Sequence, residues 1–300
     1  MPQPRALHGR PVVQGFYEAC SGSIQYVVSD PATGRCAVID PVLDFDPCSG
    51  SFATRSADAI LEHLRTEGLT PAWILDTHPH ADHVSAAPYL RERTGAPTAI
   101  GAEVTGVQRL WRDIYGLAEL PADGSQWDRL LRDGESLEIG GLDARVLFSP
   151  GHTLASVSYV VGDAAFVHDT LFMPDSGTAR ADFPGGDARA LWRSIQRILS
   201  LPPDTRLFTG HDYRPGGRPA RWESTVAEQR RCNPHLVDQT ETGFVAAREA
   251  RDRTLPLPRL MLHALQMNIR GGRPPPAGPD GGQYLRIPLN RFPGAVWPTG

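Results

Sequence analysis

Lysine is absent from this chain, so arginine accounts for all 30 of its Lys and Arg positions. These arginines form no long run, and a net charge of −4 with a pI near 6.2 leaves no basic surplus for a nucleic-acid partner. Long hydrophobic runs are also missing. No stretch approaches the roughly eighteen apolar residues of a membrane span, and residues 1–15 lack the apolar core of a secretory signal. We therefore expect a protein of the cytoplasm that does not act at a membrane.

Cysteine is scarce as well. The chain has four cysteines, and no two of them form a C-x-x-C motif. This spacing argues against a disulfide framework and against a thiolate zinc knuckle. We expect Cys20, Cys36, Cys48 and Cys232 to be free, partly buried thiols. The sequence also shows no internal repeat that would indicate a solenoid.

Histidine and aspartate are instead concentrated in one place. Residues 76–83 hold three histidines and two aspartates directly after a short apolar strand. Neutral imidazoles and carboxylates are the donors that zinc, iron and manganese prefer in proteins. His78 and His80 would share one face of an extended segment, and Asp82 and His83 follow where the chain can turn. This loop predicts part of a site for one metal or two.

Three later loops supply the same donor types. Each follows a predicted strand, and together they contribute His152, Asp169 and His211. A single residue of this kind more often plays a structural role, for example as a cap. In this order, however, the candidates are enough for two metals bridged by the second aspartate. The full set is His78, His80, Asp82, His83, His152, Asp169 and His211.

Strands and helices alternate twice, and in each half the polar donors follow strand ends. This order predicts an α/β fold, an αββα sandwich with helices outside and the site at one edge. Strands are expected at 22–29, 36–40, 73–75, 136–139, 144–148, 157–161, 165–168 and 206–208, with a loop at 41–54. Helices are expected at 56–67 with Ser56 as N-cap, and at 85–94, 103–115, 188–199, 222–231, 242–251 and 259–267. Residues 1–240 form the predicted catalytic domain, and residues 241–300 a helical and Pro/Gly-rich extension packed on it.

The ordered motifs Thr-His-x-His-x-Asp-His, Gly-His-Thr, a strand-end Asp and Gly-His-Asp resemble those of the metallo-β-lactamase superfamily. Three segments make the chain most similar to the persulfide dioxygenases and their glyoxalase II relatives: 77–87, 169–186 and 210–213. The middle segment discriminates best, because glyoxalase II enzymes usually carry a different loop after the bridging aspartate. The resemblance covers about residues 15–234 and implies a metallo-β-lactamase-like fold with a helical C-terminal extension.

This resemblance implies a mononuclear Fe(II), one per chain, held by His78, His152 and Asp169. It also implies a dioxygenase that uses O2 to oxidise the sulfane sulfur of glutathione persulfide to sulfite. The other four candidates would then form a second site or orient the ligands by hydrogen bonds. They are His80, Asp82, His83 and His211.

Glutathione carries two carboxylates, so cationic and hydrogen-bonding groups should line the mouth of the site. We expect Arg180, Tyr213 and Arg214 to contact the substrate. An internal ion pair between Arg180 and Asp182 is the alternative role for the first of them.

Other functions remain open at this level. The same ligands could hold one or two zinc ions in a hydrolase of acyl-glutathione thioesters, or the protein could be a metal-binding scaffold without turnover. His168 stands where the family commonly has glycine, and we expect it to pack beside Asp169. A homodimer through Trp222, Phe244 and the C-terminal helix is a further hypothesis, although core packing explains these residues equally well.

Overall fold

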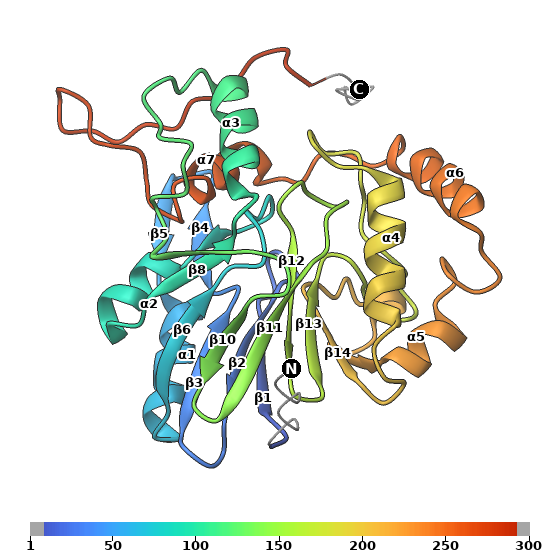
Figure 1. Ribbon diagram of the computed structural model, residues 1–300. Coiled ribbons are helices and arrows are strands. Elements are labelled where there is room, and N and C mark those ends of the chain that lie inside the picture. Colours follow the sequence, from blue (N-terminus) through green and yellow to red (C-terminus); the bar gives the residue numbers. More distant parts are fainter. Residues whose placement is uncertain (1–8, 293–300) are drawn as a thin grey trace.

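Two six-stranded sheets pack face to face in the computed structural model, which describes residues 9–292 (Figure 1). The first sheet has the order β1-β2-β3-β6-β8-β9, formed by Val12–Tyr17, Ile24–Ser29, Arg35–Ile39, Thr70–Leu75, Thr98–Gly101 and Arg129–Leu131. The second has the order β10-β11-β12-β13-β14-β15, formed by Ser136–Ile139, Leu142–Phe148, Val157–Val161, Ala164–His168, Arg206–Thr209 and Glu223–Thr225.

Helices cover both outer faces of the pair of sheets. Their bounds are α1 (Arg55–Thr66), α2 (Ala87–Thr94), α3 (Val104–Tyr115), α4 (Ala188–Leu199), α5 (Val226–Cys232), α6 (Glu241–Asp252) and α7 (Met261–Asn268), with a 3-10 turn η1 at Pro215–Gly217. Helices α1 and α2 pack on the first sheet, whereas α4 and α5 pack on the second and α6 lies outside α4 (Figure 1). The predicted α/β class and αββα sandwich are confirmed.

Alternation of side chains along each strand builds two cores at once. In β2, Ile24, Tyr26 and Val28 face the second sheet, whereas Val27 faces α1 and α2. Phe166 and Phe208 also lie between the sheets. Burial of one large apolar side chain stabilises the fold by about 1.5–3 kcal/mol. The strand ends that carry the polar loops therefore project from a well-anchored scaffold.

A small third sheet lies next to the first histidine loop. Its order is β5-β4-β7, formed by Ser51–Ala53, Val42–Asp46 and Val84–Ser85. The expectation of a loop throughout 41–54 is therefore wrong. Asp46 accepts the backbone N–H groups of Cys48 and Ser49, and this tight turn lets a segment rich in Asp, Ser and Gly fold as a hairpin.

Several helix boundaries also differ from the expectation. Helix α1 begins at Arg55, and Ser56 is not its N-cap, because the Ser56 hydroxyl and N–H both donate to Asp44. Helix α2 begins at Ala87, since the preceding pair Val84–Ser85 forms β7. The helix expected at 222–231 begins only at Val226, where Thr225 caps it.

The C-terminal segment returns to the rest of the chain. Helix α6 packs against α4, and α7 packs against α3 and β7. Of the aromatic residues considered for a dimer face, Phe244 is buried in a core, whereas Trp222 is partly buried and packs against the core between the sheets. The homodimer stays a prediction. Residues 1–8 and 293–300 of the two expected domains lie outside the described residues. No helix in the described part of the chain is long and apolar enough to cross a membrane.

Candidate metal centre

Four strand ends bring the metal-type side chains to one edge of the sandwich. Strand β6 leads into 76–83, β11 into 149–153, β13 into Asp169 and β14 into 210–213. Carboxyl ends of neighbouring parallel strands meet at the same edge of a sheet, as β13 and β14 do here. All seven predicted donors gather in groups whose ligand atoms lie within 4.8 Å of one another.

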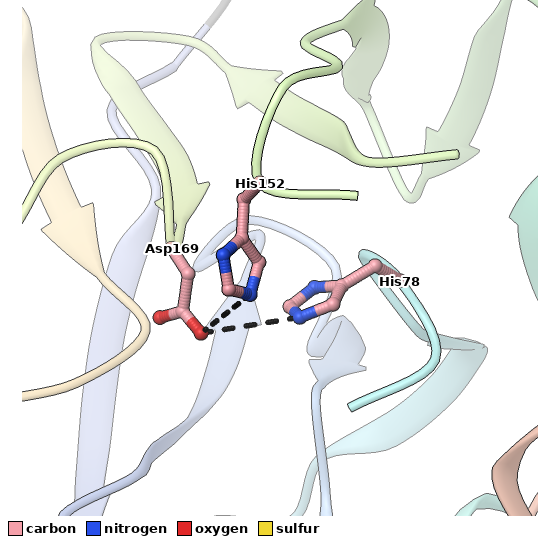
Figure 2. Close-up of side chains that lie close together, drawn as sticks. All are labelled: His78, His152 and Asp169. Atoms are coloured by element: carbon pink, nitrogen blue, oxygen red, sulfur yellow. Dashed lines mark ion pairs between the residues drawn. The ribbon is translucent and has the colours of Figure 1, made fainter. Parts of the chain in front are cut away.

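In one of these groups, the ligand atoms of His78, His152 and Asp169 face one another. Figure 2 shows both imidazoles directing Nε2 at Asp169 Oδ2, which lies 3.9 Å from the His78 atom and 3.6 Å from the His152 atom. These separations are too long for hydrogen bonds. Ligands held about 2.0–2.2 Å from a common ion lie roughly 3–4 Å from one another. The spacing therefore suits three ligands of one ion.

The tautomers of both imidazoles follow from their outer hydrogen bonds. The Thr77 hydroxyl donates to Asp40 over 2.8 Å, so its oxygen accepts from His78 Nδ1 at 3.0 Å. His152 Nδ1 donates to the carbonyl oxygen of Arg180 over 2.9 Å. Because each Nδ1 carries the proton, each Nε2 presents a lone pair to the cluster.

The protonation state of this group also fits a metal. Burial lowers the pKa of His78 well below its ordinary value and lowers that of His152 as well, so both are neutral near pH 7. His78 Nε2 is buried without a hydrogen-bond partner among residues 9–292. A buried donor atom left in this state is expected where an ion completes the site. Two neutral imidazoles and one carboxylate fit Fe(II) or Zn(II).

His80 is turned to a different carboxylate. Its Nε2 lies 3.0 Å from Asp40 Oδ1, although the angles do not make a hydrogen bond, so the contact is electrostatic. Burial lowers the pKa of His80, but the close contact with Asp40 and the charges of Asp82 and Asp76 together outweigh burial and raise it to about 9. His80 is therefore a cation near neutral pH and a poor ligand in this arrangement.

The other three candidates, Asp82, His83 and His211, form a hydrogen-bonded cluster that is joined to Asp169. His211 lies between two carboxylates, with Nε2 at 2.6 Å from Asp82 and Nδ1 at 2.5 Å from Asp169. Burial lowers the pKa of His211, yet the two carboxylates outweigh burial and raise it well above the ordinary value. The Ser23 hydroxyl completes the cluster at 2.8 Å from Asp82 and 3.1 Å from His83 Nδ1.

His168 occupies a left-handed backbone conformation with φ of 38°, which costs a residue with a Cβ roughly 1–3 kcal/mol. Its Nε2 contacts the hydroxyls of Ser149 and Thr170 at 3.1 and 2.9 Å. Its ring packs against that of His78 with centroids 5.3 Å apart. Burial lowers the pKa of His168 to about 3, so the ring is neutral.

A cavity of about 1210 Å³ opens over the cluster, and His152, Asp169 and His211 line part of it. Tyr213 and Arg180 also line this cavity, whereas Arg214 does not. The Arg180 guanidinium donates to both carboxylate oxygens of Asp182 at 2.6 and 2.8 Å and to the Pro256 carbonyl at 2.6 Å. The internal ion pair considered for Arg180 is therefore present. The guanidinium of Arg180 is already hydrogen-bonded to Asp182 and Pro256.

Sequence reasoning missed other cations of the cavity wall. Arg55, Arg251 and Arg259 line it, and none of the three forms an ion pair with another residue of the described range 9–292. They lie far apart in the sequence, so no local motif marks them. Asp40 was missed too, although its place at the end of an apolar strand matches that of Asp169.

Comparisons with known proteins place this chain in one superfamily. The family model of the Metallo-beta-lactamase superfamily matches residues 25–211, a range that includes all seven donors. The beta-lactamase hydrolase-like protein of Xylella fastidiosa is 66% identical over 287 residues, which cover 96% of this chain and 67% of that protein. The mitochondrial persulfide dioxygenase ETHE1 of Homo sapiens is 30% identical over 272 residues, which cover 89% of this chain and 92% of that protein. The crystal structure of ETHE1 from Myxococcus xanthus matches with a TM-score of 0.71 and 30% identity, covering 87% of this chain and 100% of that one.

Proposed function

Because this chain belongs to the metallo-β-lactamase superfamily, we propose that it is an iron-dependent dioxygenase that oxidises the sulfane sulfur of glutathione persulfide to sulfite. One persulfide, one O2 and one water give one glutathione, one sulfite and two protons. Such a reaction serves sulfide detoxification. Similarity to the human persulfide dioxygenase and to the Myxococcus xanthus structure supports this choice among the reactions of the superfamily.

The observation that carries the proposal is the difference between two donor groups that share Asp169. His78, His152 and Asp169 converge with long mutual distances, whereas His211 is hydrogen-bonded to two carboxylates. These two imidazoles and the carboxylate would hold a ferrous ion, which would supply the redox chemistry between a substrate sulfur and O2. Two members of this group, His152 and Asp169, line the cavity, so a substrate can reach it.

Bound Fe(II) would supply the redox chemistry, and the chain would supply orientation and electrostatics. Thr77 and the Arg180 carbonyl fix the two imidazoles by their Nδ1 atoms. His211 places a donor against Asp169 Oδ1 and thereby leaves Oδ2 to face the imidazoles. Together these contacts hold the three ligand atoms in one arrangement before substrate binds.

Cations on the cavity wall fit the charge of the proposed substrate. Glutathione carries two carboxylates, and Arg251 and Arg259 line the cavity free of ion pairs within the described range. Guanidinium groups bind carboxylates through paired hydrogen bonds. We propose that these two arginines, rather than Arg180, bind the carboxylates, with Tyr213 at the mouth of the cavity.

A thioester hydrolase is the second candidate. The gathering of all seven donors of a two-metal site supports it, since a metal-bound water with a pKa near 7 could attack an acyl-glutathione. In that case His80, Asp82, His83 and His211 would have to release their present partners to bind an ion.

The two functions differ in their need for oxygen. Protein purified without oxygen and loaded with Fe(II) should bind one iron per chain and consume O2 when glutathione persulfide is added, with sulfite formed in step. Asp169→Ala should abolish both iron binding and O2 uptake. Asp175→Ala, which removes a cavity-wall carboxylate outside the donor group, is the matched control and should retain both. No O2 uptake by iron-loaded protein, together with hydrolysis of an acyl-glutathione by zinc-loaded protein, would assign the chain to the hydrolases.

A further inference from the structure

A buried side chain of the C-terminal helix α7 makes all its hydrogen bonds to the first histidine loop and the strand that follows it. Asn268 is 2% exposed, and its Nδ2 donates to the carbonyl oxygens of His80 and His83 over 2.8 and 2.7 Å. Its Oδ1 accepts the backbone N–H of Ser85 over 2.9 Å. These three hydrogen bonds span the segment from the second histidine of the loop to Ser85, the last residue of β7.

The loop needs such support because its own backbone is irregular. Residues 76–83 lie between β6 and β7 and contain neither helix nor strand. Their carbonyl groups therefore require partners from elsewhere in the fold. The Asn268 carboxamide has two N–H donors and a carbonyl acceptor. It can therefore bond to backbone C=O and N–H groups, as the backbone of a neighbouring strand would.

A hydrogen bond joins the two ends of the loop, Asp76 and Ser85. The Ser85 hydroxyl donates to Asp76 over 2.8 Å, and Trp127 Nε1 donates to the other oxygen of that carboxylate over 2.9 Å. Asp76 begins the loop and Ser85 follows it, so their contact closes it into a ring. Asn268 then bonds to the Ser85 end of this ring and to its interior.

The backbone after α7 passes close to Ser85, at the end of this loop. Gly272 has φ of +82°, and a Cβ there would lie 2.4 Å from the carbonyl oxygen of Ser85. Only glycine permits so close an approach of one backbone to another. Helix α7 itself is seated by Met261 and Leu265 in the cluster around α3, and by Met267 against Val84. The position of Asn268 is thus set by the packing of α7 against α3 and β7.

We infer that Asn268 is a positioning residue of the metal centre, which fixes the backbone that carries His78, His80, Asp82 and His83. It lies outside the range 25–211 that matches the superfamily model. The inference rests on the proposed metal site, and it holds for either metal and either reaction. Loss of the carboxamide should let the loop shift, which would loosen the ligand geometry although no ligand has been removed.

The test compares Asn268→Ala with a matched variant elsewhere. Asn233 is 0% exposed and also makes three hydrogen bonds, to Gly177, Gln229 and His235, without contacting the loop 76–83. Three quantities are measured for each variant: the melting temperature of the metal-free protein, the Co(II) or Fe(II) dissociation constant by chelator competition, and the visible absorption of the Co(II) form.

Both variants should melt at lower temperature. Only Asn268→Ala should weaken metal binding, by about 10- to 100-fold, and change the Co(II) spectrum. If Asn268→Ala lowers the melting temperature as Asn233→Ala does but keeps the wild-type dissociation constant and spectrum, the residue is merely structural and the inference is wrong.

A nearly isosteric variant covers the case in which the alanine protein does not fold. Asn268→Asp keeps an acceptor for the Ser85 N–H but loses both donors to the carbonyl groups. It should bind metal at least 10-fold more weakly than wild type, and wild-type affinity would overturn the inference. Failure of the proposed dioxygenase would look different, because wild-type protein would then bind metal normally but consume no O2 with the persulfide.

Discussion

Replacement of Asp252 by asparagine should lower the stability of the fold, because Asp252 belongs to a buried ion pair. Asp252 and Arg248 lie one turn apart on α6 and are 3% and 5% exposed. The Arg248 guanidinium donates to Asp252 Oδ1 and also to the carbonyl oxygen of Thr178. Asp252 Oδ2 accepts the Ala181 N–H over 2.8 Å. This buried pair thus holds the backbone on both sides of Arg180.

The size of the effect follows from the burial of the pair. Loss of one partner of a buried ion pair leaves the other charge uncompensated and costs about 3–5 kcal/mol. For a chain of this length the unfolding entropy is about 0.6 kcal/mol per degree, so the melting temperature should fall by roughly 5–8 °C. The Arg180 carbonyl orients His152, and we therefore also expect the metal to bind about tenfold more weakly.

The assay is thermal and urea unfolding of the metal-free protein, followed by metal competition on the folded variant. Glu62→Gln, which breaks an exposed ion pair with Arg65 on α1, is the matched control and should change neither quantity measurably. The double variant Arg248→Met/Asp252→Leu should recover part of the lost stability, because no unpaired charge remains. A melting temperature for Asp252→Asn within about 1 °C of wild type would refute the argument from buried charge.

Three further predictions concern separate parts of the molecule. Thr77→Val removes the hydroxyl that accepts from His78 and donates to Asp40, so metal affinity should fall about 10- to 100-fold in a competition assay; unchanged affinity would mean that the tautomer is set otherwise. Burial raises the pKa of the Cys36 thiol to about 12, so a thiol reagent should modify only the three exposed cysteines until the protein is unfolded, and four fast reactions would contradict its burial. Hydrogen bonds from Arg91 lower the pKa of Asp128 to about 2, so its ionised form stabilises the fold above the unfolded pKa of about 4, and this stabilisation is lost as the pH falls toward 2. The difference in unfolding free energy between wild type and Asp128→Asn should therefore shrink between pH 5 and pH 2, and a constant difference would exclude the linkage.

Local patterns in the sequence predict the strongly periodic elements well. The helix expected at 188–199 is observed as α4, Ala188–Leu199, where the Asp187 carboxylate caps the N-terminus by accepting the Ala190 N–H. Its apolar residues recur at helical spacing, and both features are readable from a dozen neighbouring residues. The metal-type side chains were predictable for the same reason, since each follows an apolar strand.

Elements that depend on distant partners were not predictable in this way. Strand β4 pairs with β7, which follows the first histidine loop and, with two residues, is too short to show a period. Arg251 and Arg259 meet Arg55 in one cavity wall only after the C-terminal segment folds back over the sheets. The role expected for Arg180 likewise depended on whether Asp182 lay within reach.

The sequence by itself determined which donor atoms this site contains and that strand ends would carry them, because residue identity and local periodicity are properties of short segments. Only the tertiary structure decided how the donors divide. His78, His152 and Asp169 face one another, whereas His211 is bound between two carboxylates, and Asn268 reaches His80 across 188 positions of sequence. Which residues become hydrogen-bond partners depends on how whole helices and strands pack. That packing depends on cores to which distant parts of the chain contribute.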